Sequence, residues 1–365
     1  MNPLRRSLPL AILAILALSV VGCGGSRPAT PADPTAAPAA PPDPLPSWSD
    51  TATKQRIIAF VESVTDPNQV TYVKPEARIA TFDNDGTLWV EQPLYTELVF
   101  AIDRVRNLAS MHPEWKRKEP YRSLLKGDME GVASMGRRAV VDLVLTSHTG
   151  MSAELFDTIV LDWLQSAKHA RWDQLYTNLT YRPQIELLEY LRANGFTTYI
   201  VSGGTVEFMR PWTGEAYGIP KQQVIGSSVA TRFEIQGGKP SLLRLPQVEF
   251  VDDKSGKPVG IHQFIGRQPI LAFGNSDGDL EMLQYTTMGS GGTRLGLLLH
   301  HDDAVREYAY DRDSVVGRLD VALDEAPDAG WVVVSMKDDW NRVFSFDEEE
   351  ASDATAGAES AGEEE

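Results

Sequence analysis

Ala80-Thr81-Phe82-Asp83-Asn84-Asp85-Gly86-Thr87-Leu88 joins a short apolar segment to two carboxylates. Residues 77–82 are typical of a buried β-strand, and Asp83 and Asp85 follow it directly. Two carboxylates two positions apart beside such a strand repel each other unless a cation lies near them. Mg²⁺ binds oxygen ligands and suits this arrangement. For this stretch alone, a polar turn that simply ends a strand is an equally good interpretation.

A second polar segment also follows a predicted strand, in the stretch Tyr199-Ile200-Val201-Ser202-Gly203-Gly204-Thr205. The strand covers residues 197–201, and a helix is expected to begin near Thr205. Free backbone N–H groups at such a turn bind anions, and the helix dipole favours negative charge there. A tight turn with a Thr helix cap is the alternative interpretation.

Two further polar segments lie nearer the C-terminus. Residues 252–261 contain Lys254 and Lys257, and either ammonium group can neutralise the charge of a bound anion. Gly274-Asn275-Ser276-Asp277 follows a predicted strand at 269–273 and offers oxygen ligands for a hard cation. The recurrence of polar turns at strand ends is stronger evidence for a site than any one of these segments.

The apolar pattern around these turns predicts an α/β fold. Apolar strands, polar turns and amphipathic helices alternate, which is typical of a Rossmann-like three-layer core with a mainly parallel sheet. Ligands of such sheets bind at the carboxyl ends of the strands, where the polar turns are expected to meet. The predicted helices are 51–64, 185–194 and 280–285, and the other predicted strands are 225–235, 295–300 and 331–336.

In this order, the four polar segments resemble the haloacid dehalogenase-like hydrolase superfamily, and most closely its phosphoserine-phosphatase-like branch. The resemblance covers about residues 77–287. It implies that Asp83 is a nucleophile and Asp85 the general acid/base. It also implies that Ser202 and the Gly203 backbone hold phosphoryl oxygens. Lys257 is the preferred third-motif lysine, because an apolar helix-like stretch follows it, and Lys254 is the alternative.

The same resemblance implies a bound Mg²⁺. Its implied ligands are Asp83, Asp85, Asn275 and Asp279. The fourth motif departs from the family pattern, because Asn275 stands where an Asp is usual and contributes no charge. Asp277 is an alternative ligand that would restore this charge.

A mostly helical cap is predicted between the first and second motifs. Asp83 and Ser202 are 119 positions apart, whereas a simple crossover needs only one helix. We expect the cap at about residues 91–180, closing over the site and selecting the substrate. Several charged residues are candidates for the cap or rim, although a solvated or structural position is expected for each: Glu91, Glu97, Arg104, Arg106, Arg210, His300 and His301.

The two ends of the chain are predicted to lie outside the folded part at 48–346. Residues 1–22 have a basic start and an apolar run, which is typical of a secretory signal peptide. Val20-Val21-Gly22-Cys23 resembles a bacterial lipobox, which implies cleavage before Cys23 and a lipid anchor on its sulfur. Residues 23–47 form a Pro/Ala-rich linker, and residues 347–365 form a disordered acidic tail.

Charge and motifs together narrow the expected function. The net charge is −17, nine of these charges lie in the acidic tail, and no basic stripe is present, so nucleic-acid binding is not expected. We expect a Mg²⁺-dependent phosphomonoester hydrolase that acts on a small phosphorylated metabolite outside the cytoplasm, anchored to a membrane through Cys23. Asn275 favours the alternative of a lipid-tethered binding protein on a catalytically weakened fold. A related reaction at Asp83, such as dehalogenation or phosphoryl transfer, is the third possibility.

Overall fold

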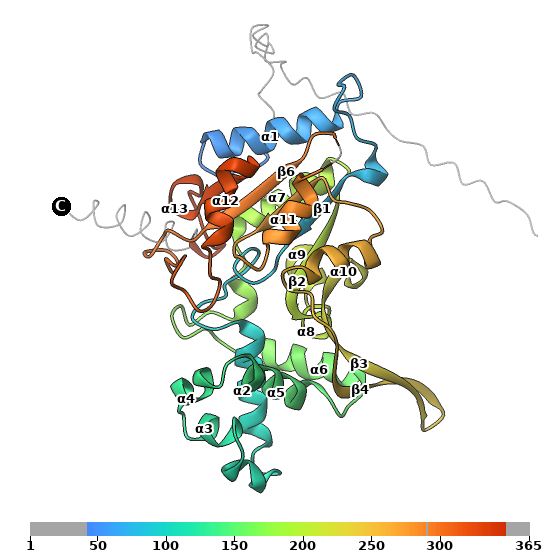
Figure 1. Ribbon diagram of the computed structural model, residues 1–365, viewed down its shortest axis with the longest axis vertical. Helices are drawn as coiled ribbons and strands as arrows, with labels where there is room; N and C mark the ends of the chain where they lie inside the picture. Colours follow the sequence, from blue (N-terminus) through green and yellow to red (C-terminus); the bar gives the residue numbers. More distant parts are fainter. Residues whose placement is uncertain (1–41, 290, 348–365) are drawn as a thin grey trace, which may run out of the picture. The chain divides into compact units, whose positions relative to one another are not determined.

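Seven strands form one sheet in the order β4-β3-β2-β1-β5-β6-β7 (Figure 1). The computed structural model describes residues 42–289 and 291–347. Neighbouring strands run parallel, except that β3 and β4 are antiparallel. The strands are β1 Ile79–Phe82, β2 Thr197–Thr205, β3 Val224–Gln236, β4 Lys239–Phe250, β5 Leu271–Gly274, β6 Leu295–His300 and β7 Val332–Ser335.

Helices cover both faces of the sheet. Successive strand residues point to opposite faces, so Ile200 packs in one core cluster and Val201 in the other. The cluster of Ile200 contains the apolar stripes of α1 (Ala52–Thr65) and α7 (Arg182–Ala193). The opposite cluster contains residues of α10 Gly256–Phe264, α11 Leu280–Thr287 and α12 Val321–Ala329. The predicted α/β fold with a three-layer core is confirmed.

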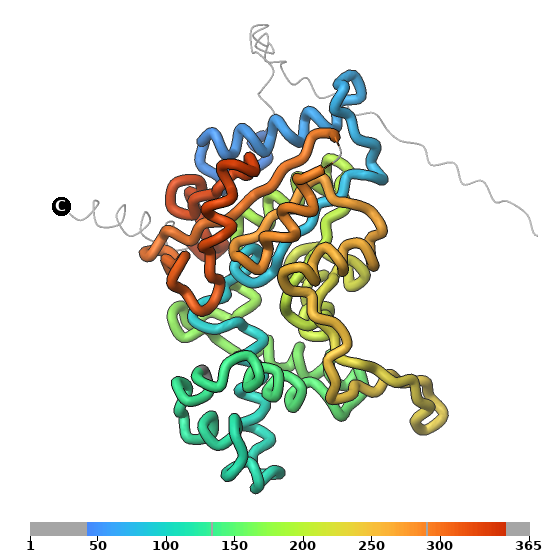
Figure 2. Tube along the Cα trace, in the orientation of Figure 1, coloured from blue at the N-terminus to red at the C-terminus, as the bar shows by residue number. Residues whose placement is uncertain are grey.

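Helices α2 to α6 lie between the first and second motifs. Figure 2 shows the chain leaving β1, running through these helices and returning to α7. Ile102, Trp115 and Leu143 belong to a hydrophobic cluster of this region that is separate from both faces of the sheet. We call this region the cap; its helices are α2 Thr96–Leu108, α3 Tyr121–Leu125, α4 Met129–Ser134, α5 Arg137–His148 and α6 Ala153–Leu164.

The cap has a β-component, of which the sequence predicted one strand, at 225–235, and missed the other. Strands β3 and β4 form a long hairpin, here called the arm, and β4 packs against α5 and α6 (Figure 1). Pro240 and Pro246 within β4 obscure the strand pattern, because proline cannot donate a ladder hydrogen bond. The available signal was Gly237-Gly238, whose positive φ angles of 56° and 77° form the two-residue turn of the hairpin.

Short helices complete the described chain. They are α8 Val206–Met209, α9 Thr213–Tyr217 and α13 Met336–Asp339, with the 3₁₀ turns Pro75–Ala77, Pro113–Arg117, Tyr176–Asn178 and Lys221–Gln223.

The compact unit that contains the sheet begins at Asp43, five residues before the predicted Trp48. Leu45 is fully buried, so the last residues of the predicted linker belong to the core. The predicted signal peptide, Cys23 and the tail from residue 348 lie outside the described residues. Within the described part of the chain, no helix is long and apolar enough to cross a membrane.

Candidate active site

The polar turns of the first, second and fourth motifs meet beside the central strand β1. Its neighbours are β2 and β5, and all three run parallel, so their carboxyl ends lie together. The backbone N–H of Asp83 donates to the carbonyl oxygen of Phe273 at 2.9 Å, which ties the first motif to the end of β5. Asp83, Ser202 and Asn275 are all buried at this edge of the sheet.

Lys257 lies between two carboxylates. Its Nζ is 2.6 Å from Oδ1 of Asp83 and 2.5 Å from Oδ1 of Asp279. Burial alone would lower the pKa of Lys257, but the carboxylates of Asp279 and Asp83 outweigh it and raise the pKa above its usual value. Lys257 therefore carries a positive charge beside Asp83. Lys254, the alternative from the sequence, is exposed and does not line the site.

Asp279 supports Lys257 and the turn of the fourth motif. Its second oxygen, Oδ2, accepts hydrogen bonds from the backbone N–H groups of Asn275 (3.0 Å) and Ser276 (3.1 Å). Both oxygens are thus engaged within the protein. Asp279 therefore positions Lys257 and this turn, and its role as a metal ligand stays a prediction.

Asp277, the alternative ligand, points to another part of the fold. Its Oδ1 accepts from the backbone N–H groups of Asp320 and Ala322, both at 3.0 Å. These contacts hold the start of α12. Asp277 therefore does not restore the charge that Asn275 lacks.

Asp85 is placed to exchange a proton. Oδ1 of Asp85 accepts a hydrogen bond from Nε1 of Trp89 at 2.8 Å. Burial raises the pKa of Asp85 to about 6, although the Trp89 hydrogen bond acts against the shift. A carboxyl group with this pKa can both give and accept a proton near neutral pH.

The second motif borders the site with small residues. The hydroxyl of Ser202 accepts from the backbone N–H of Gly204 at 3.1 Å, and Gly203 is exposed to the cavity. Ser202 and Gly203 therefore occupy the positions expected from the sequence. The absence of side chains at Gly203 and Gly204 leaves room for an anion at the end of β2.

Glu97 ties the cap to the second motif. It is buried and accepts from the backbone N–H (2.8 Å) and hydroxyl (2.5 Å) of Thr205. Its Oε1 also lies 2.9 Å from Nε2 of the buried His148. Burial would raise the pKa of Glu97, but the contacts with His148 and Thr205 lower it. Glu97 was expected on a solvated helix face, and the structure corrects this.

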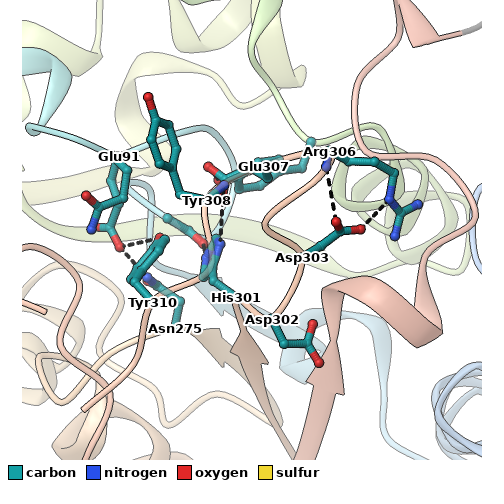
Figure 3. Close-up of polar contacts among 12 residues, drawn as sticks. Glu91, Asn275, His301, Asp302, Asp303, Arg306, Glu307, Tyr308 and Tyr310 are labelled. Carbon is teal, nitrogen blue, oxygen red and sulfur yellow. Dashed lines mark hydrogen bonds and ion pairs between the residues drawn. The ribbon is translucent and has the colours of Figure 1, made fainter. Parts of the chain in front are cut away.

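Glu91 is the second buried carboxylate that sequence reasoning placed on the surface. Its Oε1 accepts from Nδ2 of Asn275 at 2.7 Å and from the hydroxyl of Tyr310 at 2.8 Å (Figure 3). The carbonyl oxygen of Asn275 accepts from the hydroxyl of Thr87 at 3.0 Å. Gly86 leaves space for this contact, because a Cβ there would lie 2.3 Å from Oε1 of Glu91.

His301 contacts the backbone of the first-motif loop. Its Nε2 lies 2.7 Å from the carbonyl oxygen of Gly86, and its Nδ1 lies 3.2 Å from Glu307 (Figure 3). His301 also stacks on Tyr310, with ring centroids 4.4 Å apart. A polar strand terminus was expected here, and the structure instead shows a buried support for the Gly86 turn.

The remaining charged candidates have structural contacts. The guanidinium of Arg104 donates to the carbonyl oxygen of Ser147, and that of Arg210 donates to the carbonyl oxygen of Lys221. Arg106 is exposed and lies 3.5 Å from Asp103. Neither arginine of α2 lines the cavity described below.

The residues present fit a divalent cation. Asp83, Glu91 and Asp279 are buried, Asp85 is partly buried, and Lys257 is the buried ammonium group beside them. Burial raises the pKa of both Asp83 and Glu91 well above the usual range. A nearby cation would keep these carboxylates ionised.

Asp83, Asp85, Asn275 and Asp279 are the residues that would hold this cation. In the described part of the chain, no three His, Cys, Asp or Glu side chains converge on one point. Mg²⁺ suits such a set, because it commonly uses one or two carboxylates and completes its shell with water or substrate oxygens.

A cavity of about 980 Å³ opens from the site into the cap. Asp83, Asp85, Ser202 and Lys257 line it on the side of the sheet. Residues of α2, α5 and the arm line it on the opposite side. The geometry therefore brings Asp83, Asp85, Lys257 and the Ser202-Gly203 turn together at one end of a cavity.

Comparison with protein families gives a match over most of this region. The family model described as haloacid dehalogenase-like hydrolase matches residues 80–284, which is more than half of the chain. No curated protein matches the sequence.

Solved structures give weaker matches. A conserved protein of unknown function from Anaerococcus prevotii DSM 20548 is 17% identical, with 69% of this chain and 86% of that chain covered and a TM-score of 0.48. A protein of unknown function from Bordetella pertussis Tohama I is 16% identical, with coverages of 70% and 97% and a TM-score of 0.45. A phosphoserine phosphohydrolase-like protein from Francisella tularensis is 15% identical, with coverages of 61% and 87% and a TM-score of 0.34.

Proposed function

The chain belongs to the haloacid dehalogenase-like hydrolase family, and on that premise we propose that it is a Mg²⁺-dependent phosphomonoester hydrolase. The observation that carries the proposal is the bridge from Lys257 to Asp83 and Asp279, opposite the Ser202-Gly203 turn. The bridge fixes one oxygen of Asp83 and leaves the other free to attack. The positive charge of Lys257 and the exposed Gly203 in the cavity lining suit a phosphoryl group.

In the first proposed step, the free oxygen of Asp83 forms a bond to phosphorus. The bond from phosphorus to the leaving oxygen breaks, and its electron pair stays on that oxygen. Protonated Asp85 gives its proton to the leaving oxygen, so the alcohol departs uncharged. The product on the protein is an aspartyl phosphate at Asp83.

In the second step, the carboxylate of Asp85 accepts a proton from water while the water oxygen attacks phosphorus. The bond between phosphorus and Asp83 breaks, which releases inorganic phosphate and restores both carboxyl groups. Throughout, Lys257 offsets the negative charge of the phosphoryl oxygens. A bound Mg²⁺ would supply further charge neutralisation and orient the phosphoryl group.

Replacement of the nucleophile tests this function. The full chain should hydrolyse a generic aryl phosphate with added Mg²⁺, and EDTA should stop the reaction. Asp83→Asn should lower turnover by at least about 10⁴-fold, because no covalent intermediate can form. Asp173→Asn is the matched control, since Asp173 is exposed, pairs only with Lys168 in the described contacts and lies outside the cavity.

Two outcomes would contradict the proposal in different ways. Turnover that persists in Asp83→Asn would exclude Asp83 as the nucleophile. A lack of turnover over a broad panel of phosphomonoesters, together with calorimetric binding of the same compounds, would favour a binding protein on a weakened fold. The uncharged Asn275 in the fourth motif is the observation behind that second candidate.

We also propose that the protein is exported and anchored to a membrane through a lipid on Cys23. The apolar run at residues 8–21 and the position of the single cysteine directly after it support this. In bacterial cells, the protein should sediment with membranes and incorporate labelled fatty acid. Cys23→Ser should remove the label and release the protein from the membrane fraction. Label that remains in Cys23→Ser would contradict the anchor.

A further inference from the structure

We propose that the substrate is a phosphomonoester of a long aliphatic alcohol, an inference that rests on the proposed function. The cavity that opens from Asp83 has a volume of about 980 Å³. This is near the upper end of the range of roughly 300–1,000 Å³ that binds drug-sized ligands. A molecule as small as phosphoserine would fill only the part nearest the sheet.

Aliphatic side chains line the cap side of the cavity. They come from two cap helices and from the arm: Leu98 and Ile102 of α2, Val140 and Val144 of α5, Val229 of β3 and Val248 of β4. Water in a cavity with such walls is readily displaced by an apolar group, and each buried methylene contributes favourably to binding. The walls therefore match a hydrocarbon better than a polar leaving group.

The lining has few basic or aromatic groups that would bind an anionic or aromatic leaving group. Its basic side chains are Lys257, which Asp83 and Asp279 already engage, and the exposed Arg137. An amino acid carboxylate would thus meet only one available cation. Tyr95 is the aromatic residue of the lining, so stacking surfaces for a base or aryl ring are scarce. An aliphatic chain needs neither kind of contact.

Further apolar residues lie on the arm beyond the cavity, and the Thr231–Arg244 pair separates them from it. Val229 pairs with Val248 in the cavity wall, and Phe233 pairs with Leu242 further out on the same hairpin. Val229 and Phe233 are four residues apart on β3 and therefore project from the same face. Phe233 and Leu242 are exposed, at 63% and 45%.

A homologous series of n-alkyl phosphates tests the proposal with the full chain. Ethyl, butyl, hexyl and octyl phosphate are compared with O-phosphoserine below their micelle concentrations. We expect kcat/KM to rise about two- to fourfold per added methylene, or roughly 60- to 4,000-fold over the six methylenes from ethyl to octyl. Phosphoserine should be a poorer substrate than butyl phosphate.

Two variants test whether the cavity wall causes the dependence of kcat/KM on chain length. Val140→Asp and Val248→Asp place a carboxylate in the wall at positions that are already 37% and 40% exposed, so folding should be tolerated. Each should reduce the octyl-to-ethyl ratio at least tenfold. Val70→Asp is the control, because Val70 is fully exposed and lies outside the lining. Melting curves verify that each variant is folded.

Binding separates failure of this inference from failure of the proposed function. Calorimetry with Asp83→Asn should show the Kd of the alkyl phosphates falling with chain length. If aryl phosphate is hydrolysed but neither kcat/KM nor Kd changes with chain length, the aliphatic substrate is excluded and the hydrolase stands. If no phosphomonoester is hydrolysed but binding still strengthens with chain length, the protein binds an aliphatic ligand and the proposed hydrolase function is excluded.

Discussion

At the level of a single residue, Glu91 would supply a bound Mg²⁺ with the charge that Asn275 lacks. Glu91 is 2% exposed and lies one hydrogen bond, 2.7 Å, from the Asn275 amide. An amide that donates to a carboxylate keeps its carbonyl oxygen turned away from that carboxylate. Residues that orient a ligand in this way typically change metal affinity by about 10–100-fold when they are altered. Glu91 and Asn275 together would thus replace the usual Asp.

Glu91→Gln should weaken Mg²⁺ binding by about 10–100-fold, because Gln keeps the contacts with Tyr310 and Asn275 but removes the charge. Without metal, the same variant should be more stable than the wild-type protein near pH 8. Burial, opposed by the Tyr310 hydrogen bond, raises the pKa of Glu91, so its ionised form destabilises the fold. Calorimetric titration with Mg²⁺ measures the first effect, and urea unfolding in EDTA measures the second.

Glu154→Gln is the matched control, since Glu154 is exposed at the start of α6. It should change neither the Mg²⁺ affinity nor the urea midpoint. If Glu91→Gln binds Mg²⁺ as tightly as the wild-type protein, the charge of Glu91 does not contribute to Mg²⁺ binding.

Asp252 should make stability depend on pH. Burial raises the pKa of Asp252 to about 7, against about 3.9 in an unfolded chain. The folded state therefore binds more protons between these values, and stability falls as pH rises from about 4 to about 7. From pH 5 to pH 8, Asp252 should reduce the free energy of unfolding by roughly 2–3 kcal/mol. Asp252→Asn should remove this loss in urea titrations at the two pH values.

The exposed Asp173→Asn should keep the wild-type pH profile of stability. A profile for Asp252→Asn that falls as steeply as that of the wild-type protein would contradict the assignment. In that case the carboxyl of Asp252 would be ionised in the folded state at little cost.

Sequence patterns predicted those site residues that follow a strand directly. Asp83, Ser202 and Asn275 could be placed because parallel strands end at one edge of the sheet. Glu91 and Glu97 could not, because their burial depends on cap residues and on Tyr310, which is more than 200 positions away. The spacing of apolar residues near Glu91 and Glu97 in the sequence cannot predict a contact with a residue so far along the chain.

At the level of secondary-structure elements, the attachment of the arm to the rest of the protein depends on one side chain, Arg244. Arg244 of β4 is fully buried, and its Nε donates to the carbonyl oxygen of His148 at 2.6 Å. Its guanidinium carbon lies 3.9 Å from the ring centroid of Phe156, and Nη2 lies 3.6 Å from Glu207. One residue thus joins the arm to the end of α5, to α6 and to α8.

Arg244→Met should lower the free energy of unfolding by roughly 3–5 kcal/mol, because Glu207 loses its buried partner and the His148 carbonyl loses a donor. Arg232→Met is the control on the same hairpin, where the exposed guanidinium pairs only with Glu234 in the described contacts. The control should stay within about 0.5 kcal/mol of the wild-type protein. Equal urea midpoints for the two variants would contradict the anchoring role of Arg244.

The strands of the core and the first strand of the arm were predictable to within a few residues, whereas β4 was not. The strands at 79–82 and 295–300 are continuous apolar runs, as expected for strands buried on both faces. Strand β4 of the arm is mostly exposed and contains two prolines. Its sequence therefore lacks the alternation of apolar and polar residues that predicts a strand. Only the Gly237-Gly238 turn marks it.

Segments from both ends of the described chain close the fold of the whole molecule. The rings of Trp48 and Trp340 meet edge to face with centroids 5.9 Å apart, and Ser49 N–H donates to the carbonyl oxygen of Asp339 at 2.8 Å. Just before Trp48, Leu45 is fully buried. The backbone N–H and hydroxyl of Ser47 each donate to the carboxylate of Glu186 at 2.7 Å. Residues 43–47 therefore contribute core contacts although their sequence is typical of a linker.

A chain of residues 48–347 should be less stable than one of residues 43–347 by roughly 3–5 kcal/mol. The shorter chain loses the burial of Leu45, worth roughly 2 kcal/mol, and the two hydrogen bonds that satisfy the buried Glu186. Urea unfolding measures the difference, and Leu45→Ala in the longer chain should reproduce about half of it. Because residues 43–47 precede α1, and neither they nor Glu186 of α7 line the cavity, aryl phosphate turnover at 20 °C should be equal in both chains. Equal urea midpoints would place the boundary of the folded part at Trp48, where the amino-acid pattern alone puts it.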